Sequence, residues 1–342
     1  MAFTEILVAL LAAAGTVSAQ QTYSLVKTYD KSNNFFDLFV VRDRAFFQKL
    51  GYPTGDPTSG FVNYVSREEG IKSGLIAYRG NQLYIGVDYN TTLSPKGPGR
   101  KSVRLESKTA FDNGLMLIDI QHMPGNMCGS WPAFWGYNAD ENPYSEIDIL
   151  EGGGWPKQTS NIMSLHTCGQ CSFPNLKGNE ARSDCDMNAG PRCEGVVKNP
   201  AGCGLTAPKD TYGDGFNKNG GGVYAMQLNA DGIKIWFHPR NKIPFDISMG
   251  KPNTTGWPNL LVNFPTSKTC NVSKIFKNLS IIINTTFCGS SIYDWKAQTD
   301  GWPQCRSAPG GTCEAYVAAN PQAYKEAYWL FNYVKIYQDK KK

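Results

Sequence analysis

The sequence predicts an all-β protein, a sandwich of antiparallel sheets, from two observations. Short runs rich in aromatic and β-branched residues, bounded by Gly, Asn, Asp or Pro, follow one another along the whole chain, and this pattern is typical of antiparallel sandwiches. Helical periodicity is weak, with one short helix expected over residues 321–327. In chain order the expected strands are Leu83–Tyr89, Ser102–Phe111, Leu115–Met123, Glu146–Leu150, Ile162–His166, Val223–Leu228, Ile233–Phe237, Leu279–Phe287 and Tyr328–Tyr337.

The clearest pair of expected strands is a hairpin. Large apolar residues alternate with small or polar ones over 223–228 and again over 233–237. Asp231-Gly232 between the two runs supplies the turn chemistry that a hairpin needs. The sequence therefore predicts that these two strands are adjacent and antiparallel.

The chain of 342 residues is expected to form one domain over residues 20–342, because no linker, repeat or low-complexity tract divides it. Residues 1–19 are expected to be a signal peptide, since an apolar run ends in the small-x-small pattern Val17-Ser18-Ala19. Two long loops over 168–222 and 287–313 are rich in Gly, Pro and Cys. Loops of such length are usually functional or rim a binding site.

The cysteines and the glycosylation motifs indicate a secreted, extracellular protein. Ten cysteines follow the leader, an even number that an oxidising compartment would pair. The spacing of Cys168 and Cys171 leaves a zinc or redox site as the alternative. The protein is expected to be a monomer that carries N-linked glycans. Its Asn-x-Ser/Thr motifs begin at Asn90, Asn253, Asn271, Asn278 and Asn284.

Charge and motif patterns exclude several function classes. The formal net charge is +5, but apart from the Lys340–Lys342 tail the basic residues are dispersed, so no nucleic-acid surface is expected. No second apolar stretch long enough to span a bilayer follows the leader, and no membrane partner is expected. The three histidines lack metal-ligand spacing. The runs 97–100 and 220–222 are expected to be turns, so neither a metal nor a cofactor is predicted.

The stretch S-E-I-D-I-L-E-G over 145–152 carries three acids in an otherwise strand-like run. Glu146 and Asp148 share one face of a strand, but Glu151 lies at an odd offset from Glu146 and would point to the other face. A β-bulge, which adds one residue to one strand, would turn Glu151 back to the first face. A solvated edge strand is the alternative, and the aliphatic residues on the opposite face weigh against it because they indicate a buried, central strand.

Two carboxyl groups converging on one face are the equipment of glycoside cleavage. A third carboxylate between them raises the pKa of at least one member, which keeps a proton available. If Glu146 and Glu151 lie about 5 to 5.5 Å apart, the reaction is expected to retain anomeric configuration through a covalent glycosyl-enzyme.

Aromatic residues just upstream are candidates for sugar stacking. In Trp131-Pro132-Ala133-Phe134-Trp135, the two indoles share a strand face with the small Ala133 between them, which leaves room for a pyranose ring. Two core tryptophans are the alternative reading, and Pro132 fits poorly in a central strand. His166 would come beside Glu146 if its strand were the antiparallel neighbour.

These residues resemble family 16 glycoside hydrolases, in particular their fungal laminarinase-type members, the endo-β-1,3(4)-glucanases. The resemblance covers nearly the whole chain beyond the leader. It is carried by W-P-A-F-W, E-I-D-I-L-E and S-L-H-T together with G-F-V-N-Y-V, T-L-S-P-K-G-P-G-R-K-S-V-R, N-G-G-G-V-Y-A-M, I-K-I-W-F-H-P-R-N and N-T-T-F-C-G.

The resemblance implies a β-jelly-roll of two antiparallel sheets with a concave substrate cleft for a β-glucan. It implies that Glu146 is the nucleophile, Asp148 the assisting carboxylate and Glu151 the acid/base. Trp131, Trp135 and His166 match positions around the sugar next to the cleaved bond. Four further matches are implied to line the non-reducing side of the cleft, namely Asn63, Tyr64, Arg100 and Arg104.

Two departures from the family pattern concern the outer sugar sites. Relatives carry a Trp shortly before the catalytic strand, where this chain has Glu141-Asn142-Pro143-Tyr144, and another soon after F-C-G, where residues 290–293 intervene. Trp155 and Trp295 are the candidates to substitute for them.

The leading hypothesis is a secreted, endo-acting, retaining β-glucanase that cleaves β-1,3 or mixed β-1,3/1,4 linkages. One alternative is a β-glucan-binding lectin on the same sandwich, which the intact acidic triplet disfavours. The other is a transglycosylase, because a sugar can intercept a glycosyl-enzyme in place of water.

Overall fold

The computed structural model describes residues 23–138, 144–152, 158–169, 171–187, 193, 199–289, 295–301, 303–306 and 311–339. The expected signal peptide, Trp155 and most of the two family departures lie outside the described residues. None of the helices in the described ranges is both long and apolar enough to span a bilayer.

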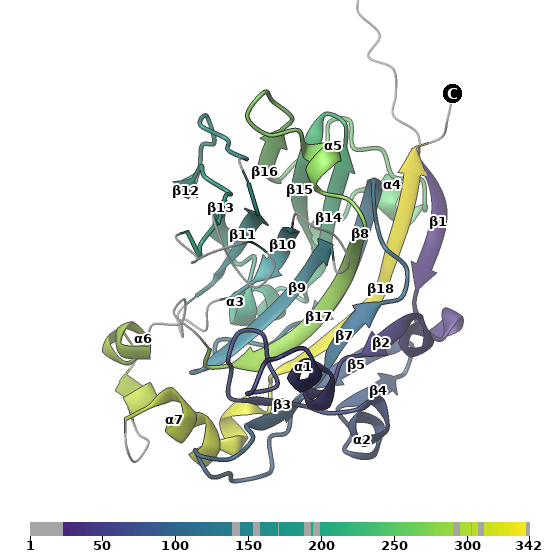
Figure 1. Cartoon of the computed structure of the whole chain (residues 1–342). Helices are drawn as coiled ribbons and strands as arrows, with labels where there is room; N and C mark the ends of the chain where they lie inside the picture. Colours follow the sequence, from purple (N-terminus) through teal and green to yellow (C-terminus); the bar gives the residue numbers. More distant parts are fainter. Residues whose placement is uncertain are drawn as a thin grey trace, which may run out of the picture.

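Two eight-stranded sheets stack face to face, and both are strongly curved (Figure 1). Every pairing within them is antiparallel, as the sequence predicts. Sheet A runs in the order β16 (Leu260–Pro265), β15 (Gly232–Pro239), β14 (Gly222–Asn229), β8 (Gly114–His122), β18 (Tyr328–Asp339), β5 (Gln82–Gly86) and β4 (Ile76–Arg79), with β1 (Tyr23–Tyr29) also beside β18. Sheet B runs in the order β12 (Asn179–Arg182), β13 (Cys203–Lys209), β11 (Ser160–Thr167), β10 (Ser145–Glu151), β9 (Ser130–Asn138), β17 (Leu279–Phe287), β7 (Arg104–Ser107) and β2 (Phe39–Val41).

Short helices and one small parallel strand pair surround the sandwich (Figure 1). The parallel pair is β3 (Val62–Tyr64) with β6 (Arg100–Ser102). The α-helices are α1 (Arg44–Lys49), α2 (Arg67–Lys72), α3 (Gly213–Lys218), α4 (Phe245–Ser248), α5 (Val272–Ile275), α6 (Trp295–Gly301) and α7 (Cys313–Ala319). The 3₁₀ helices are η1 (Lys31–Asn33), η2 (Phe35–Leu38), η3 (Arg240–Lys242), η4 (Pro303–Arg306) and η5 (Pro321–Tyr324).

The main core fills the space between the two sheets. Ile118 and Phe331 enter it from sheet A, while Phe134, Ile147 and Leu165 enter it from sheet B. Burial of such side chains on both inner faces is what holds two sheets together. Because β10 lies between β9 and β11 and its aliphatic side chains are in this core, it is a central strand rather than a solvated edge.

Each expected strand is present, but the sequence missed others. The run over 102–111 contains the end of β6 and the whole of β7. Several strands were not expected, including the two at the edge of sheet B, β12 and β13, which lie inside the predicted loop over 168–222. The expected helix over 321–327 is only the 3₁₀ helix η5, and α7 precedes it. The edge strand β12 has mostly exposed side chains and lacks the alternation on which the predictions depend.

The predicted hairpin is β14 and β15, with a turn one residue earlier than expected. Asn229 pairs with Gly232, so Ala230 and Asp231 form the loop. The Asn229 side chain accepts a hydrogen bond from the Asp231 amide at 2.9 Å, which is the local bonding that favours Asn at turns.

All ten cysteines are paired in disulfides. Cys168 bonds Cys193, and Cys171 bonds Cys270. The structural interpretation of the C-x-x-C spacing is therefore confirmed, and its two thiols form neither a zinc site nor a redox pair.

Candidate active site

The acidic strand β10 contains the predicted bulge. Against β9, Asp148 pairs with Trp135 but Leu150 pairs with the next residue, Phe134, so one extra residue lies on β10. Ile149 and Leu150 are consecutive, yet both lie in the core between the sheets, which a regular strand does not allow. The bulge turns Glu151 to the outer face of sheet B, opposite the core.

A buried side chain on β11 holds the bulge in place. The Asn161 amide nitrogen donates to the Ile149 carbonyl at 2.7 Å, and its oxygen accepts from the Glu151 amide at 2.8 Å. A bulge leaves backbone groups without ladder partners, and buried groups of that kind are costly unless they are satisfied. Asn161 supplies both partners and has no exposed surface. Sequence reasoning missed it, because an Asn before an apolar run gives no sign of the strand that it serves.

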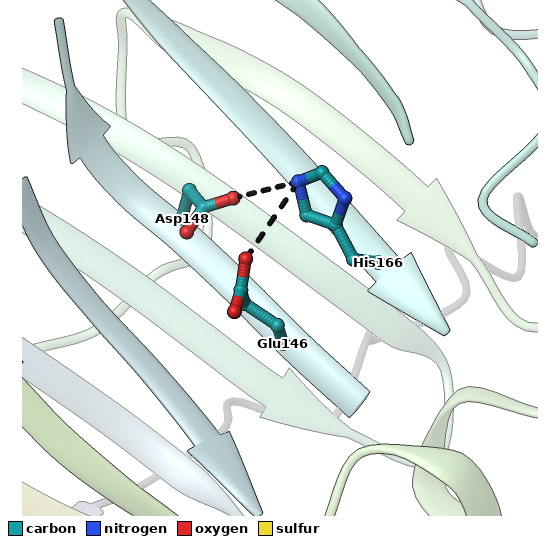
Figure 2. A group of neighbouring side chains, drawn as sticks. All are labelled: Glu146, Asp148 and His166. Atoms are coloured by element: carbon teal, nitrogen blue, oxygen red, sulfur yellow. Dashed lines mark ion pairs between the residues drawn. The ribbon is translucent and has the colours of Figure 1, made fainter. Parts of the chain in front are cut away.

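His166 joins two of the acids on the outer face of sheet B, as Figure 2 shows. It is the register partner of Glu146 across β10 and β11. Its Nε2 lies 3.1 Å from Asp148 Oδ2 and 3.7 Å from Glu146 Oε1. One ligand atom from each of these three residues lies within 4.8 Å of the others, so the group could hold a small cation. The same three groups are also of the kinds that can act as an acid/base set.

Glu151 is the acid that retains a proton. Burial, and next the charge of Asp148, raise the pKa of Glu151 to about 8. The indole N–H of Trp131, which donates to Glu151 Oε1 at 2.8 Å, acts in the opposite direction, as does the nearby His166. A carboxyl group with this pKa is protonated at neutral pH and is suited to general acid catalysis.

Asp148 is almost fully buried between the two glutamates. Burial first and the charge of Glu146 second hold the pKa of Asp148 well above its usual range, while Arg182 lowers it. Asp148 Oδ2 has no hydrogen bond of good geometry among the described residues. The charge state of Asp148 therefore depends on both Glu146 and Arg182 in addition to its burial.

Tyr144 is a contact of Glu146 that the sequence did not single out as a site residue. Its phenol donates a hydrogen bond to Glu146 Oε2, which leaves Oε1 on the His166 side. Burial and then the charge of Glu146 raise the pKa of the Tyr144 phenol well above its usual range, so the phenol stays a donor. Tyr144 ends the segment 141–144, where the sequence departs from the expected family pattern.

The predicted indole pair lies on β9, with both rings partly exposed and Ala133 between them. The Trp135 N–H donates to Asn284 Oδ1 at 2.8 Å, and the Asn284 amide donates to the Tyr64 hydroxyl at 3.1 Å. Trp135 also stacks on Tyr137 with ring centroids 5.2 Å apart. These contacts fix the plane of the ring, as a stacking surface requires.

Pro132 occupies a central strand without breaking a ladder. The amide of Gly152, one residue beyond the end of β10, donates to the Pro132 carbonyl at 3.2 Å. In an antiparallel ladder the N–H and C=O of one residue face the same neighbour. The position where Pro132 lacks an N–H therefore lies at the end of the pairing with β10, so the ladder is not interrupted.

Three of the four residues implied to line the cleft do not reach the surface. Arg100 has no exposed area, because its guanidinium donates to the carbonyls of Asp88, Thr91 and Val317. Arg104 is 4% exposed and lies under the Trp135 ring, 4.9 Å from its centroid.

Tyr64 is 1% exposed and bonded to Asn284. Arg104 packs against the Trp135 ring, and Tyr64 is linked to Trp135 through Asn284. Of the four residues implied to line the cleft, only Asn63 is partly exposed.

One further expectation changes for the same reason. Asn284 is 6% exposed with its amide in hydrogen bonds, so this motif is not an accessible glycan acceptor. Trp295, a candidate for an outer sugar site, is partly exposed; it donates to the Gly311 carbonyl and packs on Tyr316 in the α6–α7 region, and its role stays a prediction.

The chain is similar to known proteins in both sequence and structure. A sequence model described as an XgeA-like, catalytic GH16 domain matches residues 51–337. A probable endo-1,3(4)-β-glucanase of Neosartorya fischeri is 39% identical over 326 residues, which cover 93% of this chain and 46% of that protein. The chain thus spans about half the length of this relative.

Two solved structures are similar over their whole length. A laminarinase 16A of Phanerochaete chrysosporium, described with β-glucans in both donor and acceptor sites, is 36% identical with a TM-score of 0.78, and the match covers 93% of this chain and 100% of that one. An elongating β-1,3-glucosyltransferase of the same family is 38% identical with a TM-score of 0.76, covering 92% and 100%. The expected jelly-roll arrangement of the two sheets is confirmed.

Proposed function

The chain belongs to glycoside hydrolase family 16, and from this premise we propose that it is a secreted endo-β-glucanase that cleaves β-1,3 or mixed β-1,3/1,4 linkages with retention. The observation that carries the proposal is the bulge in β10. It gathers Glu146, Asp148 and Glu151 on one face and leaves a proton on the last of them.

In the first step, Glu151 gives its proton to the glycosidic oxygen while the Glu146 carboxylate attacks the anomeric carbon. The bond from that carbon to the leaving oxygen breaks, and a glycosyl ester on Glu146 forms. In the second step, the ionised Glu151 takes a proton from water, whose oxygen attacks the same carbon and releases Glu146. Asp148 and His166 lie beside Glu146 and stabilise the charge that shifts between these states.

Transfer to a sugar is the second candidate, because a neighbour 38% identical is described as an elongating glucosyltransferase. It uses the same glycosyl ester, with a sugar hydroxyl in place of water. Secretion is part of the proposal and is supported by the five disulfides.

The test measures reducing ends released from laminarin and from mixed-linkage glucan, with mass spectrometry of the products to separate hydrolysis from transfer. Glu146→Ala and Glu151→Ala are each expected to lose roughly 1,000-fold or more. Glu68→Ala, which removes an exposed glutamate on α2, is the matched control and keeps full activity. If the wild-type protein bound glucan but released no reducing ends, the result would indicate a glucan-binding lectin rather than an enzyme.

Azide with an aryl laminaribioside separates the two roles. In Glu151→Ala, azide is expected to attack the glycosyl ester and give the β-azide, whereas in Glu146→Ala it takes the place of the nucleophile and gives the α-azide. The reverse pattern would exchange the two assignments.

A further inference from the structure

A continuous row of register partners crosses the edge half of sheet B. Asp148 on β10 pairs with Ser164 on β11, Ser164 pairs with Gly204 on β13, and Gly204 pairs with Arg182 on β12. Directly paired residues point to the same face of a sheet. Arg182 therefore lies on the outer face, in line with the acids but two strands beyond β11.

The glycine in this row lets the arginine reach across. Because Gly204 has no side chain, nothing on β13 separates Arg182 from β11, and Arg182 Nη2 donates to Ser164 Oγ at 3.2 Å. A Cβ at position 204 would lie 2.0 Å from the Met163 carbonyl oxygen, so the backbone there excludes a side chain. The charge of Arg182 is also close enough to lower the pKa of Asp148.

The guanidinium keeps an unused donor on this face. Arg182 Nε is buried and has no hydrogen-bond partner in the part of the chain that the structure describes. A buried donor without a partner costs about 1–3 kcal/mol, and a movement of this partly exposed side chain that brings Nε to an acceptor on a ligand would recover that cost. Guanidinium presents its donors as a rigid planar fork, and a pair of sugar hydroxyls offers oxygen acceptors that such a fork can bind.

Arg182 and the indoles flank β10 on opposite sides. Trp131 and Trp135 are on β9, whereas Arg182 is reached through β11 and β13. A glucan that crosses β10 at the acids has one part over the indoles and the other towards Arg182. The family resemblance implies that the indoles lie around the sugar next to the cleaved bond. We take this to be the sugar that becomes attached to Glu146, so the other part is the leaving group or, in transfer, the acceptor.

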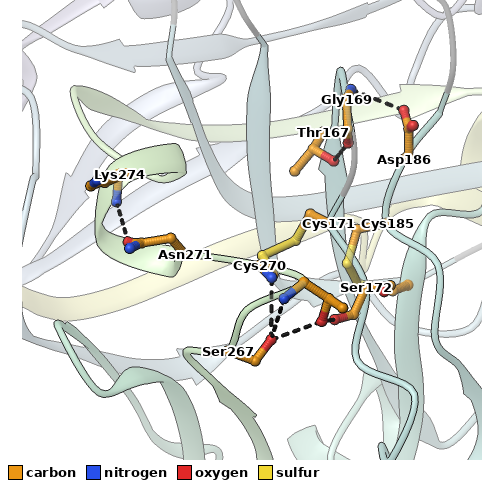
Figure 3. The surroundings of a disulfide bond; sticks show 12 residues. Thr167, Gly169, Cys171, Ser172, Cys185, Asp186, Ser267, Cys270, Asn271 and Lys274 are labelled. Carbon is orange, nitrogen blue, oxygen red and sulfur yellow. Dashed lines mark hydrogen bonds between the residues drawn. A yellow bond between two sulfur atoms is a disulfide. The ribbon is translucent and has the colours of Figure 1, made fainter.

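Disulfides hold this edge in position. Cys185 bonds Cys203, which joins the chain just after β12 to the residue before Gly204. The neighbouring Cys171–Cys270 bond, shown in Figure 3 beside Cys185, anchors the same loop. The Cys185 amide donates to the Cys171 carbonyl at 2.9 Å. Arg182 is thus carried on a cross-linked support, and preorganisation of this kind lowers the cost of binding.

We propose that Arg182 binds the leaving-group sugar, which is also the acceptor sugar in transfer, through hydrogen bonds to its hydroxyls. This makes Arg182 a specificity-determining residue on the side of the site opposite the indoles. The inference rests on the proposed function, since it takes cleavage at the acids as given.

The experiment compares Arg182→Met, which keeps the length of the side chain without its donors, with the wild type on two substrates. Laminaripentaose needs both sides of the site, whereas a nitrophenyl laminaribioside places only its aryl leaving group on the Arg182 side. Arg182→Met is expected to lower kcat/KM for the pentaose by about 10- to 100-fold and for the aryl glycoside by less than about 3-fold. The ratio of transfer to hydrolysis with added laminaribiose is expected to fall about 10-fold.

Lys209→Met is the matched control, because it removes an exposed cation from the end of β13; it should leave both substrates unchanged. Equal losses on both substrates, with a shifted pH profile, would mean that Arg182 acts only through Asp148 and would overturn the proposal. The proposal would also be overturned if Arg182→Met turned over both substrates at the wild-type rate. If the wild-type protein turned over neither substrate, the proposed function itself would be rejected instead.

Discussion

In the proposed mechanism, the two sides of β10 both bind sugar, but they are held in place by different supports. On one side β9 pairs with β17 over nine consecutive residues, from Leu279–Asn138 to Phe287–Ser130, and it presents indole rings. On the other side β12 is a four-residue edge strand, and it presents an arginine. The first side is ordered by strand pairing and the second by covalent cross-links, so the two should fail under different changes.

The difference also concerns the kind of contact. Indole faces gain by covering apolar surface and lose little conformational entropy, so they suit a sugar that must stay bound through two steps. A guanidinium binds by directional hydrogen bonds and is strongly dependent on geometry. That suits the side from which one sugar must leave and another enter.

The largest effect is expected from removing the cross-link on the Arg182 side. Cys185→Ser with Cys203→Ser should lower the free energy of unfolding by about 3 kcal/mol, since the bond closes a short loop. Denaturant titration measures this. The variant should also lose activity on laminaripentaose selectively, with the aryl laminaribioside turned over as before.

The matched control is Cys288→Ser with Cys313→Ser, which opens a bond beside α7 away from β12. It should cost similar stability without the selective loss. If both double variants discriminated equally against the pentaose, the edge would not depend on its own cross-link.

A smaller effect is expected on the other side from Trp135→Ala. It removes the stack on Tyr137 and the hydrogen bond to Asn284. The loss in kcat/KM should be roughly 30-fold, about 2 kcal/mol, and it should be the same for the pentaose and the aryl glycoside because both fill this side. A loss confined to the pentaose would place Trp135 on the leaving-group side instead.

The smallest effect concerns the proton on Glu151. General acid catalysis needs the protonated form, so kcat/KM of the wild type should fall as pH rises through about 8. The Trp131 N–H stabilises the ionised form and lowers this pKa. Trp131→Phe should therefore move the fall to higher pH by about half to one unit, as a pH profile with laminaripentaose, whose sugar leaving group needs the proton, would measure.

Trp257→Phe provides the comparison, since Trp257 donates to Asp246 on the far side of sheet A, and its profile should coincide with the wild type. A fall moved to lower pH in Trp131→Phe would contradict the assigned role of the indole.

The sequence predicted the side of the site that depends on local patterns. The odd spacing of Glu151 was sufficient to predict the bulge, and the spacing of the indoles predicted their common face. The role of Asn161 escaped prediction because it acts across strands, on backbone atoms that the bulge displaces.

Arg182 escaped prediction for a related reason, since its position depends on the register of four strands, two of which the sequence did not reveal. Arg100 was misplaced because a motif match carries no information on burial. Its charge is satisfied by carbonyls from distant segments, which no local pattern records.

The two hydrogen bonds of Asn161 have a consequence for how the sheet assembles. If β11 paired with β10 one residue out of step, the Ile149 carbonyl and the Glu151 amide would both lose their partner inside the protein, at a cost of about 1–3 kcal/mol each. A misaligned sheet is therefore penalised at the backbone atoms that orient Glu151, the proposed catalytic acid. Folding to the correct alignment and acquiring the chemistry become one event, so few molecules should be stable yet inert.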